Sequence, residues 1–249
     1  MLGKRVLLVE GKDDQHVISN LLVARKEKLQ KRVAKGGRIE IWRPGGEHDE
    51  EVDQTPAMVI WVECPKEDQE SDESGGIDKL LAAIPAWLHE SDLERLAIVV
   101  DADDEGADRR WEQIRGRLSS TGFGEVPKDL PENGVVELSF RPQTPRSVRL
   151  AVWVMPDNHS RGMLEDFVAR LIPDNDDMCP IVSRFLSSIP QEKRRFHGQD
   201  HAKAWIHSWL AVQNQPGRPM GQAITVGYLC AAGETADRFL NWLDNALIN

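Results

Sequence analysis

Short apolar runs alternate along the chain with longer segments of helical periodicity. Continuous apolar runs bounded by polar residues predict buried strands, and apolar side chains that recur every three or four residues predict amphipathic helices. The predicted strands cover 5–9, 38–42, 58–62, 96–100, 134–138 and 148–155. Helices are predicted after residue 10 and over 77–90, 107–118 and 163–171. Apolar strands that alternate with helices indicate a parallel sheet covered on both faces.

This order predicts an α/β fold with a parallel, or mostly parallel, sheet flanked by helices and followed by a mainly helical C-terminal part. We expect an α/β domain over residues 1–173, with an acidic insertion at about 44–76. Residues 174–249 are expected to form a helical extension that packs on this domain. Within the insertion, 44–57 and 64–76 contain few apolar residues and are expected to lie outside the core.

Charge is distributed unevenly along the chain, whose formal net charge is −10. Residues 47–73 hold eleven acidic residues and one lysine, so the remainder of the chain is close to neutral. Within that remainder, residues 25–43 hold eight Lys or Arg residues and two Glu residues. Such a basic stripe either binds a polyanion, such as nucleic acid, or is an ordinary solvated helix and loop.

The three cysteines, Cys64, Cys179 and Cys230, form no C-x-x-C pair and are odd in number. This favours a reducing compartment and argues against a zinc ribbon or a disulfide framework. The first apolar run is too short for a signal peptide, and no stretch reaches the length of a membrane span. We therefore expect a cytoplasmic protein without a membrane partner.

Acidic residues follow three of the predicted strands. They are Glu10, Asp13 and Asp14 after the first strand, Asp101 and Asp103 after 96–100, and Asp157, Glu165 and Asp166 after 148–155. Parallel strands end at one edge of a sheet, and ligands bind there. Two carboxylates about 5 Å apart repel by roughly 3 kcal/mol at an effective dielectric constant of ~20, so a cluster must protonate or hold a cation. Carboxylate oxygens suit Mg²⁺ or Mn²⁺, although each acid taken singly is also explained as a helix cap.

The D-x-D pair is the most specific part of this pattern. Side chains alternate along an extended segment, so Asp101 and Asp103 are expected to point the same way and to share one ion. Gly106 then allows the chain to turn into the next helix.

Two motifs resemble those of the Toprim domain, the metal-binding α/β fold of topoisomerases, bacterial primases and OLD-family nucleases. They are E-G-x-x-D at Glu10, Gly11 and Asp14, and D-x-D-x-x-G at Asp101, Asp103 and Gly106, each after an apolar strand. These motifs cover residues 5–118 only. The stretches GGIDKLL, VVDAD, GMLEDF and KAWIHSWLA are also similar to a prokaryotic family of uncharacterised stand-alone Toprim-like proteins, and this likeness covers most of the chain.

The resemblance implies that Glu10 acts as a general acid or base and that Asp101 and Asp103 bind Mg²⁺. In OLD-type nucleases a further acid and a lysine nearer the C-terminus complete a two-metal site, and the matching residues here are Glu165 and Lys203. Asp14 and Asp166 are supporting metal-ligand candidates. Lys203 is also explained as a solvated charge on its helix.

The implied function is Mg²⁺- or Mn²⁺-dependent cleavage of phosphodiester bonds in DNA or RNA. A topoisomerase is not expected, because the only tyrosine, Tyr228, lies far from the motifs. A primase is not expected either, because no zinc module is present. The chain has no G-x-x-x-x-G-K-[ST] sequence and therefore no P-loop of its own. The alternative is a non-catalytic metal-binding subunit of a separate ATPase.

Overall fold

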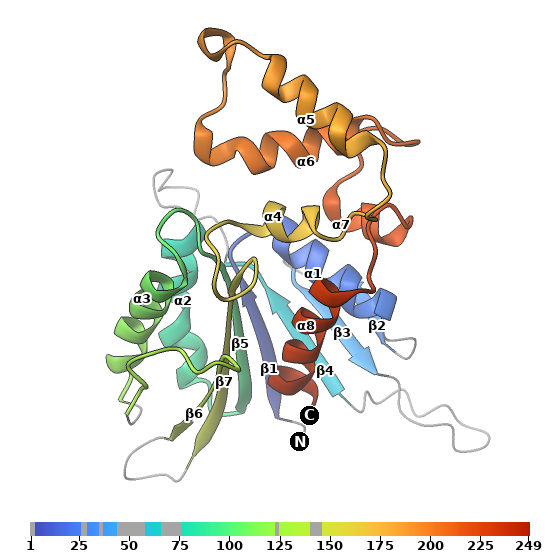
Figure 1. Ribbon diagram of the computed structural model, residues 1–249. Coiled ribbons are helices and arrows are strands. Elements are labelled where there is room, and N and C mark those ends of the chain that lie inside the picture. Colours follow the sequence, from blue (N-terminus) through green and yellow to red (C-terminus); the bar gives the residue numbers. More distant parts are fainter. Residues whose placement is uncertain are drawn as a thin grey trace, which may run out of the picture.

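The computed structural model describes residues 3–25, 29–34, 37–43, 58–65, 76–122, 125–139 and 146–249. These residues form a seven-stranded sheet in the order β2-β3-β4-β1-β5-β7-β6, with helices on both faces (Figure 1). The strands are β1 (Lys4–Val9), β2 (Gln30–Val33), β3 (Ile39–Arg43), β4 (Met58–Glu63), β5 (Leu93–Asp101), β6 (Val135–Ser139) and β7 (Ser147–Met155). The helices are α1 (Lys12–Arg25), α2 (Gly76–His89), α3 (Ala107–Ser119), α4 (Leu164–Ala169), α5 (Met178–Ser188), α6 (His201–Ala211), α7 (Met220–Thr225) and α8 (Glu234–Leu243). Short turns of 3₁₀ helix, η1 (Gln191–Lys193) and η2 (Gly198–Asp200), and a π-helical turn, η3 (Asp244–Ile248), complete the helical part.

The centre of the sheet is parallel and its edges are antiparallel. Strands β4, β1, β5 and β7 pair in parallel, whereas β2, β3 and β6 join the sheet through antiparallel pairs. The central strands carry continuous apolar runs, but β6 alternates buried and exposed residues, as an edge strand with one solvated face does. The structure therefore confirms the predicted α/β class and the mostly parallel core of the sheet.

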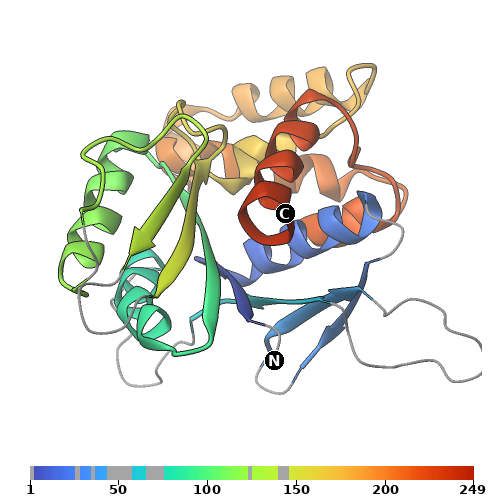
Figure 2. The same cartoon turned by 90° about the horizontal axis from the view of Figure 1, so that it is seen from below.

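The alternation of side chains along each central strand divides the core into two layers. Leu7 and Val9 of β1 face a core built with α1, α4 and the later helices, whereas Val6 and Leu8 face a core built with α2 and α3. Figure 2 shows these layers, with α2 and α3 on one side of the sheet and α1 and α8 on the other. Both faces of the parallel strands are covered, which is why their sequence is apolar without a break.

One strand was not expected from the sequence. The four residues of β2 are all exposed, and they pair only with β3 at the edge of the sheet. The sequence Q-K-R-V has no alternation that would predict a strand, and lysine and arginine are common on edge strands because they discourage pairing with another chain. The interpretation of 25–43 as a solvated helix and loop is thus wrong for β2, while residues 26–28 and 35–36 lie outside the described residues.

The expected acidic insertion at about 44–76 contains a central strand, β4, as the sequence predicted for 58–62. Residues 44–57 and 66–75, to which the rest of this expectation refers, lie outside the described part of the chain.

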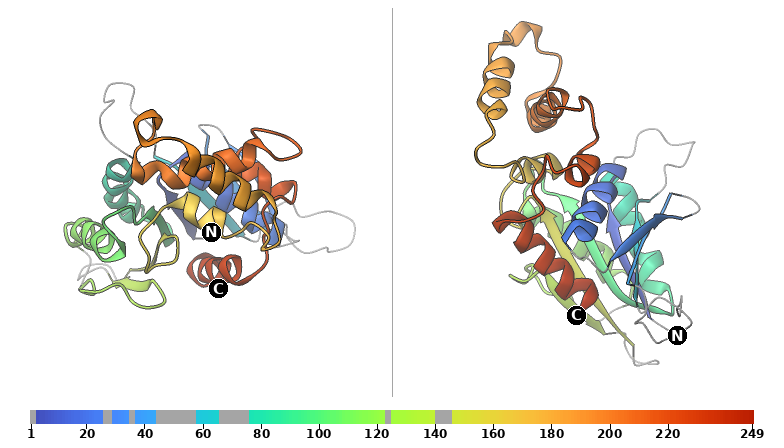
Figure 3. Two further views of the ribbon diagram at one scale, coloured as in Figure 1. Left: turned by 45° about the horizontal axis from the view of Figure 1, so that its top comes forward. Right: turned by 90° about the vertical axis from the view of Figure 1, so that its right-hand side faces the viewer.

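The C-terminal part is mainly helical, as predicted. Helices α5 and α6 lie side by side above the edge of the sheet where the parallel strands end (Figures 1 and 3). Helix α8 returns to the sheet, where the ring of Phe239 meets Trp153 of β7 edge-on with centroids 5.2 Å apart. No helix among the described residues is both long enough and apolar enough to cross a membrane.

Candidate metal centre

Two of the predicted acids meet at the ends of neighbouring strands. Glu10 follows β1 and Asp101 ends β5, and these strands pair in parallel. The chain leaves β1 into α1 on one face of the sheet and leaves β5 into α3 on the other. This is the place where the ligand crevice of an open α/β sheet lies, and we call the space between the two strand ends the crevice. Across it, the backbone amide of Asp101 donates a hydrogen bond of 2.8 Å to Oε1 of Glu10.

Asp14 and Glu165 enter the same crevice from two helices. Asp14 lies in the first turn of α1, where it is 7% exposed, and its Oδ2 accepts a hydrogen bond of 3.1 Å from the amide of Gly11. Oδ1 of Asp101 accepts a hydrogen bond of 2.8 Å from the amide of Leu164, which joins the start of α4 to the end of β5. Glu165 follows directly and is 6% exposed. We call Glu10, Asp14, Asp101 and Glu165 the inner carboxylates.

The inner carboxylates are withdrawn from solvent and repel one another. Desolvation raises the pKa of Glu10 to about 7. Desolvation, and then the charge of Glu10, raises the pKa of Asp14. The pKa of Asp101 is raised well above its ordinary value by desolvation and by the other three inner carboxylates, and desolvation also raises the pKa of Glu165. Four such groups do not ionise together at neutral pH unless a cation joins them.

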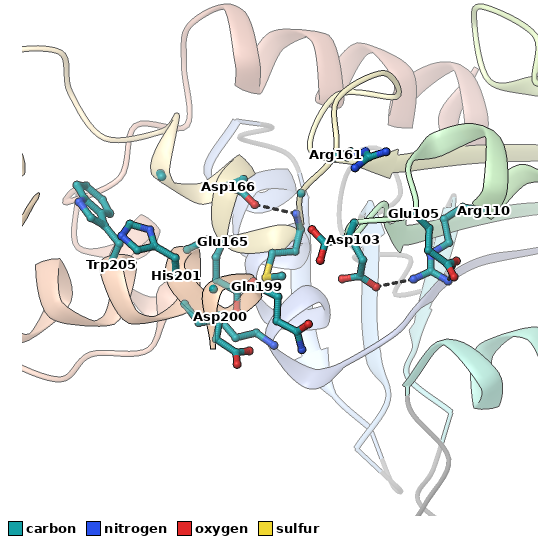
Figure 4. Close-up of a pocket in the computed structure, with 17 residues that line it drawn as sticks. Asp103, Glu105, Arg110, Arg161, Glu165, Asp166, Gln199, Asp200, His201 and Trp205 are labelled. Carbon is teal, nitrogen blue, oxygen red and sulfur yellow. Dashed lines mark hydrogen bonds and ion pairs between the residues drawn. The ribbon is translucent and has the colours of Figure 1, made fainter. Parts of the chain in front are cut away.

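Asp103 is placed differently from its expected position. Its φ of 49° turns the chain, and its amide and carbonyl pair with Gly162 in an antiparallel bridge. The D-x-D segment is therefore not extended at Asp103, although the charge of Asp103 still acts to raise the pKa of Asp101 and Glu10. The Asp103 side chain is 43% exposed and forms an ion pair with Arg110 (Figure 4).

Arg110 is a site residue that the sequence analysis missed. It is buried on α3, and its Nε donates a hydrogen bond of 2.8 Å to the carbonyl oxygen of Asp101. Its charge opposes the rise in the pKa of Glu10. An arginine four residues after Gly106, in the first turn of the helix that follows D-x-D-x-x-G, is the signal that could have indicated it.

Asp166 caps the helix that carries Glu165. Its Oδ2 accepts a hydrogen bond of 2.9 Å from the amide of Met163 (Figure 4). Gly162 has a φ of 134°, and a Cβ on it would lie 2.7 Å from the same oxygen, so this approach requires glycine. Asp166 therefore stands at the rim of the site, with one oxygen committed to the cap.

Asp157, which follows β7, has protein partners of its own. Its Oδ2 accepts a hydrogen bond of 2.7 Å from Arg170, and its Oδ1 accepts one of 2.7 Å from the amide of Ser160. Although partial burial acts in the opposite direction, these hydrogen bonds hold the pKa of Asp157 below its usual range. Asp157 is thus charge-compensated within the chain, unlike the inner carboxylates.

A cleft of about 660 Å³ opens beside the inner carboxylates and is closed on its far side by η2 and α6. Glu165 and Asp166 line it from α4 (Figure 4), and Lys203 lines it from α6. Arg110 and Arg161 add two guanidinium groups to its wall. Lys203 is exposed in this cleft, and its charge opposes the rise in the pKa of both Glu10 and Glu165. The structure thus brings Lys203 to the predicted acids from a distant part of the chain.

The start of α2 forms another wall of the crevice. A Cβ on Gly76 would lie 3.1 Å from the carbonyl oxygen of Glu10 and 3.5 Å from its Cβ. A larger residue would press on the backbone that presents Glu10, so the glycine in GGIDKLL allows α2 to begin against this acid.

The donor set fits Mg²⁺ or Mn²⁺. Among the described residues, no three His, Cys, Asp or Glu side chains are already arranged to hold an ion. Mg²⁺ does not require such a cage, because it keeps several of its waters and binds proteins through one or two carboxylates together with substrate phosphates. The inner carboxylates offer only hard oxygen donors, and Glu10 and Asp101 lie close enough for one to accept a hydrogen bond from the amide of the other.

Comparison with known proteins gave a match to one family model and no match to an individual protein. Neither the comparison with curated proteins nor the comparison with solved structures gave a match. A family model described as "Protein of unknown function (DUF3226)" matches residues 4–248. This match runs from β1 to η3 and includes the crevice, the cleft and the helices above them. The chain therefore belongs to the DUF3226 family.

Proposed function

We propose that this protein is a Mg²⁺- or Mn²⁺-dependent phosphodiesterase that cleaves nucleic acid on a Toprim-like sheet. The observation that carries the proposal is the mutual proximity of the four inner carboxylates, which come from the end of β1, the end of β5, α1 and α4. Clusters of perturbed carboxyl groups in a cleft are a frequent mark of a functional site. Without a bound cation, their mutual repulsion would only cost stability.

The cations in the adjacent cleft support an anionic substrate. Arg161 and Lys203 line the cleft beside Glu165, and Arg110 contacts the backbone of Asp101 from within it. Guanidinium and ammonium groups bind phosphate oxygens through charged hydrogen bonds. The cleft is also lined by acids, and Arg110 is paired with Asp103 and Glu105. Arg161 and Lys203 therefore supply the cations that would share a substrate phosphate with a metal ion in this proposal.

The residues of the site have separable tasks in this proposal. Asp101 and Glu165 hold the ion, which supplies Lewis-acid polarisation of a phosphoryl oxygen when bound. Glu10, whose pKa lies near 7, is suited to exchange a proton at neutral pH. Lys203 stabilises the negative charge that develops on the phosphate.

A cleavage assay tests this function. Metal-stripped protein is incubated with single- and double-stranded DNA and RNA, with and without Mg²⁺ or Mn²⁺. Cleavage is expected only with metal, and Asp101→Asn should abolish it while keeping the oxygen that accepts from the amide of Leu164. Asp157→Asn is the matched control, because this acid follows another strand of the same sheet but is paired with Arg170.

A second function, a metal-binding subunit of a separate ATPase, is favoured by one observation. Ile181 and Phe185 lie one turn apart on α5 and are 44% and 57% exposed. Two large apolar side chains on a helix above the cleft suit contact with another protein. If the purified protein binds Mn²⁺ but cuts none of the four substrates, this second function replaces the first.

A further inference from the structure

A second cavity, of about 480 Å³, lies between α1, α7 and β2. These three elements lie side by side at the right of Figure 1. Its polar lining includes His16 and Asn20 from α1, Lys31 from β2, and Arg218 and Gln222 at the start of α7. None of the described residues that line it is acidic. We call this cavity the basic groove.

Two cations of the basic groove, Lys31 and Arg218, have neutral hydrogen-bond partners. Lys31 donates a hydrogen bond to Oδ1 of Asn20, and Arg218 donates one of 2.9 Å to Oε1 of Gln222. Among the described residues, neither Lys31 nor Arg218 forms an ion pair with a carboxylate. Partial desolvation lowers the pKa of Lys31. Two uncompensated positive charges in a concave site are suited to an anion.

Two other cations near the groove, in contrast, form ion pairs with carboxylates. Arg32 is the next residue along β2 and also lines the cavity, but it forms an ion pair of 2.7 Å with Glu40 of β3. Arg25, at the end of α1, pairs with Asp237 of α8. Of the Lys and Arg residues that line the groove, Arg32 thus has a carboxylate partner, and Lys31 and Arg218 have none among the described residues.

Close packing of α7 on α1 builds the groove. A Cβ on Gly221 would lie 2.9 Å from Nδ2 of Asn20 and 2.9 Å from the carbonyl carbon of His16. Asn20 is buried, and it also accepts a hydrogen bond of 3.3 Å from Thr225 of α7. The groove is therefore fixed by a tight contact between two helices, and Arg218, which precedes α7, lines the same cavity as Lys31.

Helix α1 connects the basic groove to the acidic crevice. Asp14 is one of the inner carboxylates, and Asn20 in the groove lies six residues further along the same helix. At 1.5 Å per residue, their Cα atoms are separated by about 9 Å along the helix axis. Phosphates in one strand of a nucleic acid advance by about 3.4 Å per nucleotide along a helix axis. Measured along the axis of α1 alone, the separation corresponds to about three nucleotides of such a strand.

We propose that the basic groove binds the sugar-phosphate backbone of a nucleic-acid strand that enters the acidic crevice. The inference rests on the proposed function for its substrate, and it adds a binding site on a different part of the molecule. Lys31 and Arg218 contact phosphates, while Asn20 and Gln222 hold these two side chains in place. The groove determines where the strand lies and takes no part in bond cleavage.

Fluorescence anisotropy with labelled oligonucleotides of about 15 nucleotides, single-stranded DNA and RNA, tests this inference in EDTA, where no cleavage occurs. Lys31→Gln combined with Arg218→Gln should weaken binding by about 10-fold or more at about 50 mM salt. The slope of log K against log salt should become shallower by about 1.4, because each single-strand phosphate contact contributes about 0.7. The matched control, Arg115→Gln with Arg117→Gln, removes two cations from α3 on the other side of the sheet and should change neither quantity (Figure 2).

The folding of the double variant is checked by its melting curve and by the shift of its melting temperature in Mn²⁺. If the double variant fails to fold, Arg218→Gln alone should reduce the salt slope by about 0.7. An unchanged affinity and slope would overturn the inference, as would binding of inorganic phosphate without binding of oligonucleotides. Unchanged binding with persistent metal-dependent cleavage would refute the groove alone. Reduced binding without cleavage in any metal would refute the phosphodiesterase alone.

Discussion

The acidic crevice and the basic groove share helix α1, and each collects charges of one sign that the described residues do not balance. Three of the inner carboxylates, Glu10, Asp14 and Asp101, each accept a hydrogen bond from a backbone amide. The cations of the groove are held by side-chain amides, those of Asn20 and Gln222. In both places neutral hydrogen-bonding groups fix a charged group without neutralising it.

Elsewhere the chain pairs similar charges. Asp157 binds Arg170, and Arg32 binds Glu40. Since an uncompensated charge in a partly dry site costs free energy, stability alone would favour pairing or removing it. On the proposed function, the difference separates charges that the chain itself neutralises from charges that are left for an external ion, a cation in the crevice and an anion in the groove.

The largest expected effect concerns proton exchange at Glu10. Glu10→Gln keeps an oxygen that can accept from the amide of Asp101, but its side chain cannot take up a proton. Cleavage should fall by about 10²–10⁴-fold, the usual contribution of general acid–base catalysis. Mn²⁺ affinity, measured by calorimetry, should fall far less. Parallel losses of cleavage and Mn²⁺ affinity would make Glu10 a metal ligand only, and Asp157→Asn should leave both unchanged.

The unbalanced acids predict a pH dependence of the metal-free protein. A carboxyl group whose pKa is raised in the folded state binds protons more tightly there than in the unfolded chain, so the free energy of unfolding falls as pH rises. For Glu10 the window runs from its ordinary pKa of 4.5 to about 7, which corresponds to about 3 kcal/mol. The other inner carboxylates act in the same direction. Urea unfolding in EDTA across this window should show the loss, Glu10→Gln should reduce it, and a flat profile would contradict it.

A bound metal ion should offset the electrostatic repulsion among the inner carboxylates. Mn²⁺ at one hundred times its dissociation constant adds about 2.7 kcal/mol, or roughly 5–10 °C in melting temperature for a chain of this size. Asp101→Asn should lose this response and should melt higher than the wild type in EDTA, because one repelling charge is gone. Asp157→Asn should keep the full response. If Mn²⁺ does not shift the melting temperature of the wild-type protein, the crevice does not bind the metal ion.

A substitution at the contact between α1 and α7 should weaken binding in the basic groove and leave metal binding in the crevice unchanged. Gly221→Ala places a methyl group 2.9 Å from the backbone of His16, so α7 must move away from α1. Overpacking of this kind costs about 1–3 kcal/mol, which urea unfolding measures. Oligonucleotide binding in EDTA should weaken, and the melting shift in Mn²⁺ should persist. Loss of the Mn²⁺ shift as well would mean that the two sites are not independent.

The parallel core and the first acids could be predicted because their signals are local. The apolar run of 96–100 and the acid that follows it fix both the strand and the place of Asp101 at the sheet edge. Strand β2 could not be predicted, because an exposed edge strand has neither an apolar run nor an alternation.

The finer geometry of the site depends on tertiary contacts. The turn at Asp103 is set by its bridge to Gly162, which the D-x-D spacing does not contain. The meeting of Lys31 and Arg218 depends on α7 packing against α1 at Gly221. Spacing along the chain predicts which residues follow a strand, but it does not predict which side chains face one another across two elements.

Helix α8 and the π-helical turn η3 have a consequence for how the protein is made. Phe239, Trp242 and Leu247 belong to the core on the face of the sheet that β1, β5 and β7 share, and Arg5 donates a hydrogen bond of 2.9 Å to the carbonyl oxygen of Leu247. The part of this face that α8 and η3 cover therefore stays open until residue 248 has left the ribosome. Contacts this distant in sequence slow folding and leave apolar surface open to aggregation, so we expect a growing chain that already carries every site residue to bind chaperones until α8 and η3 have emerged.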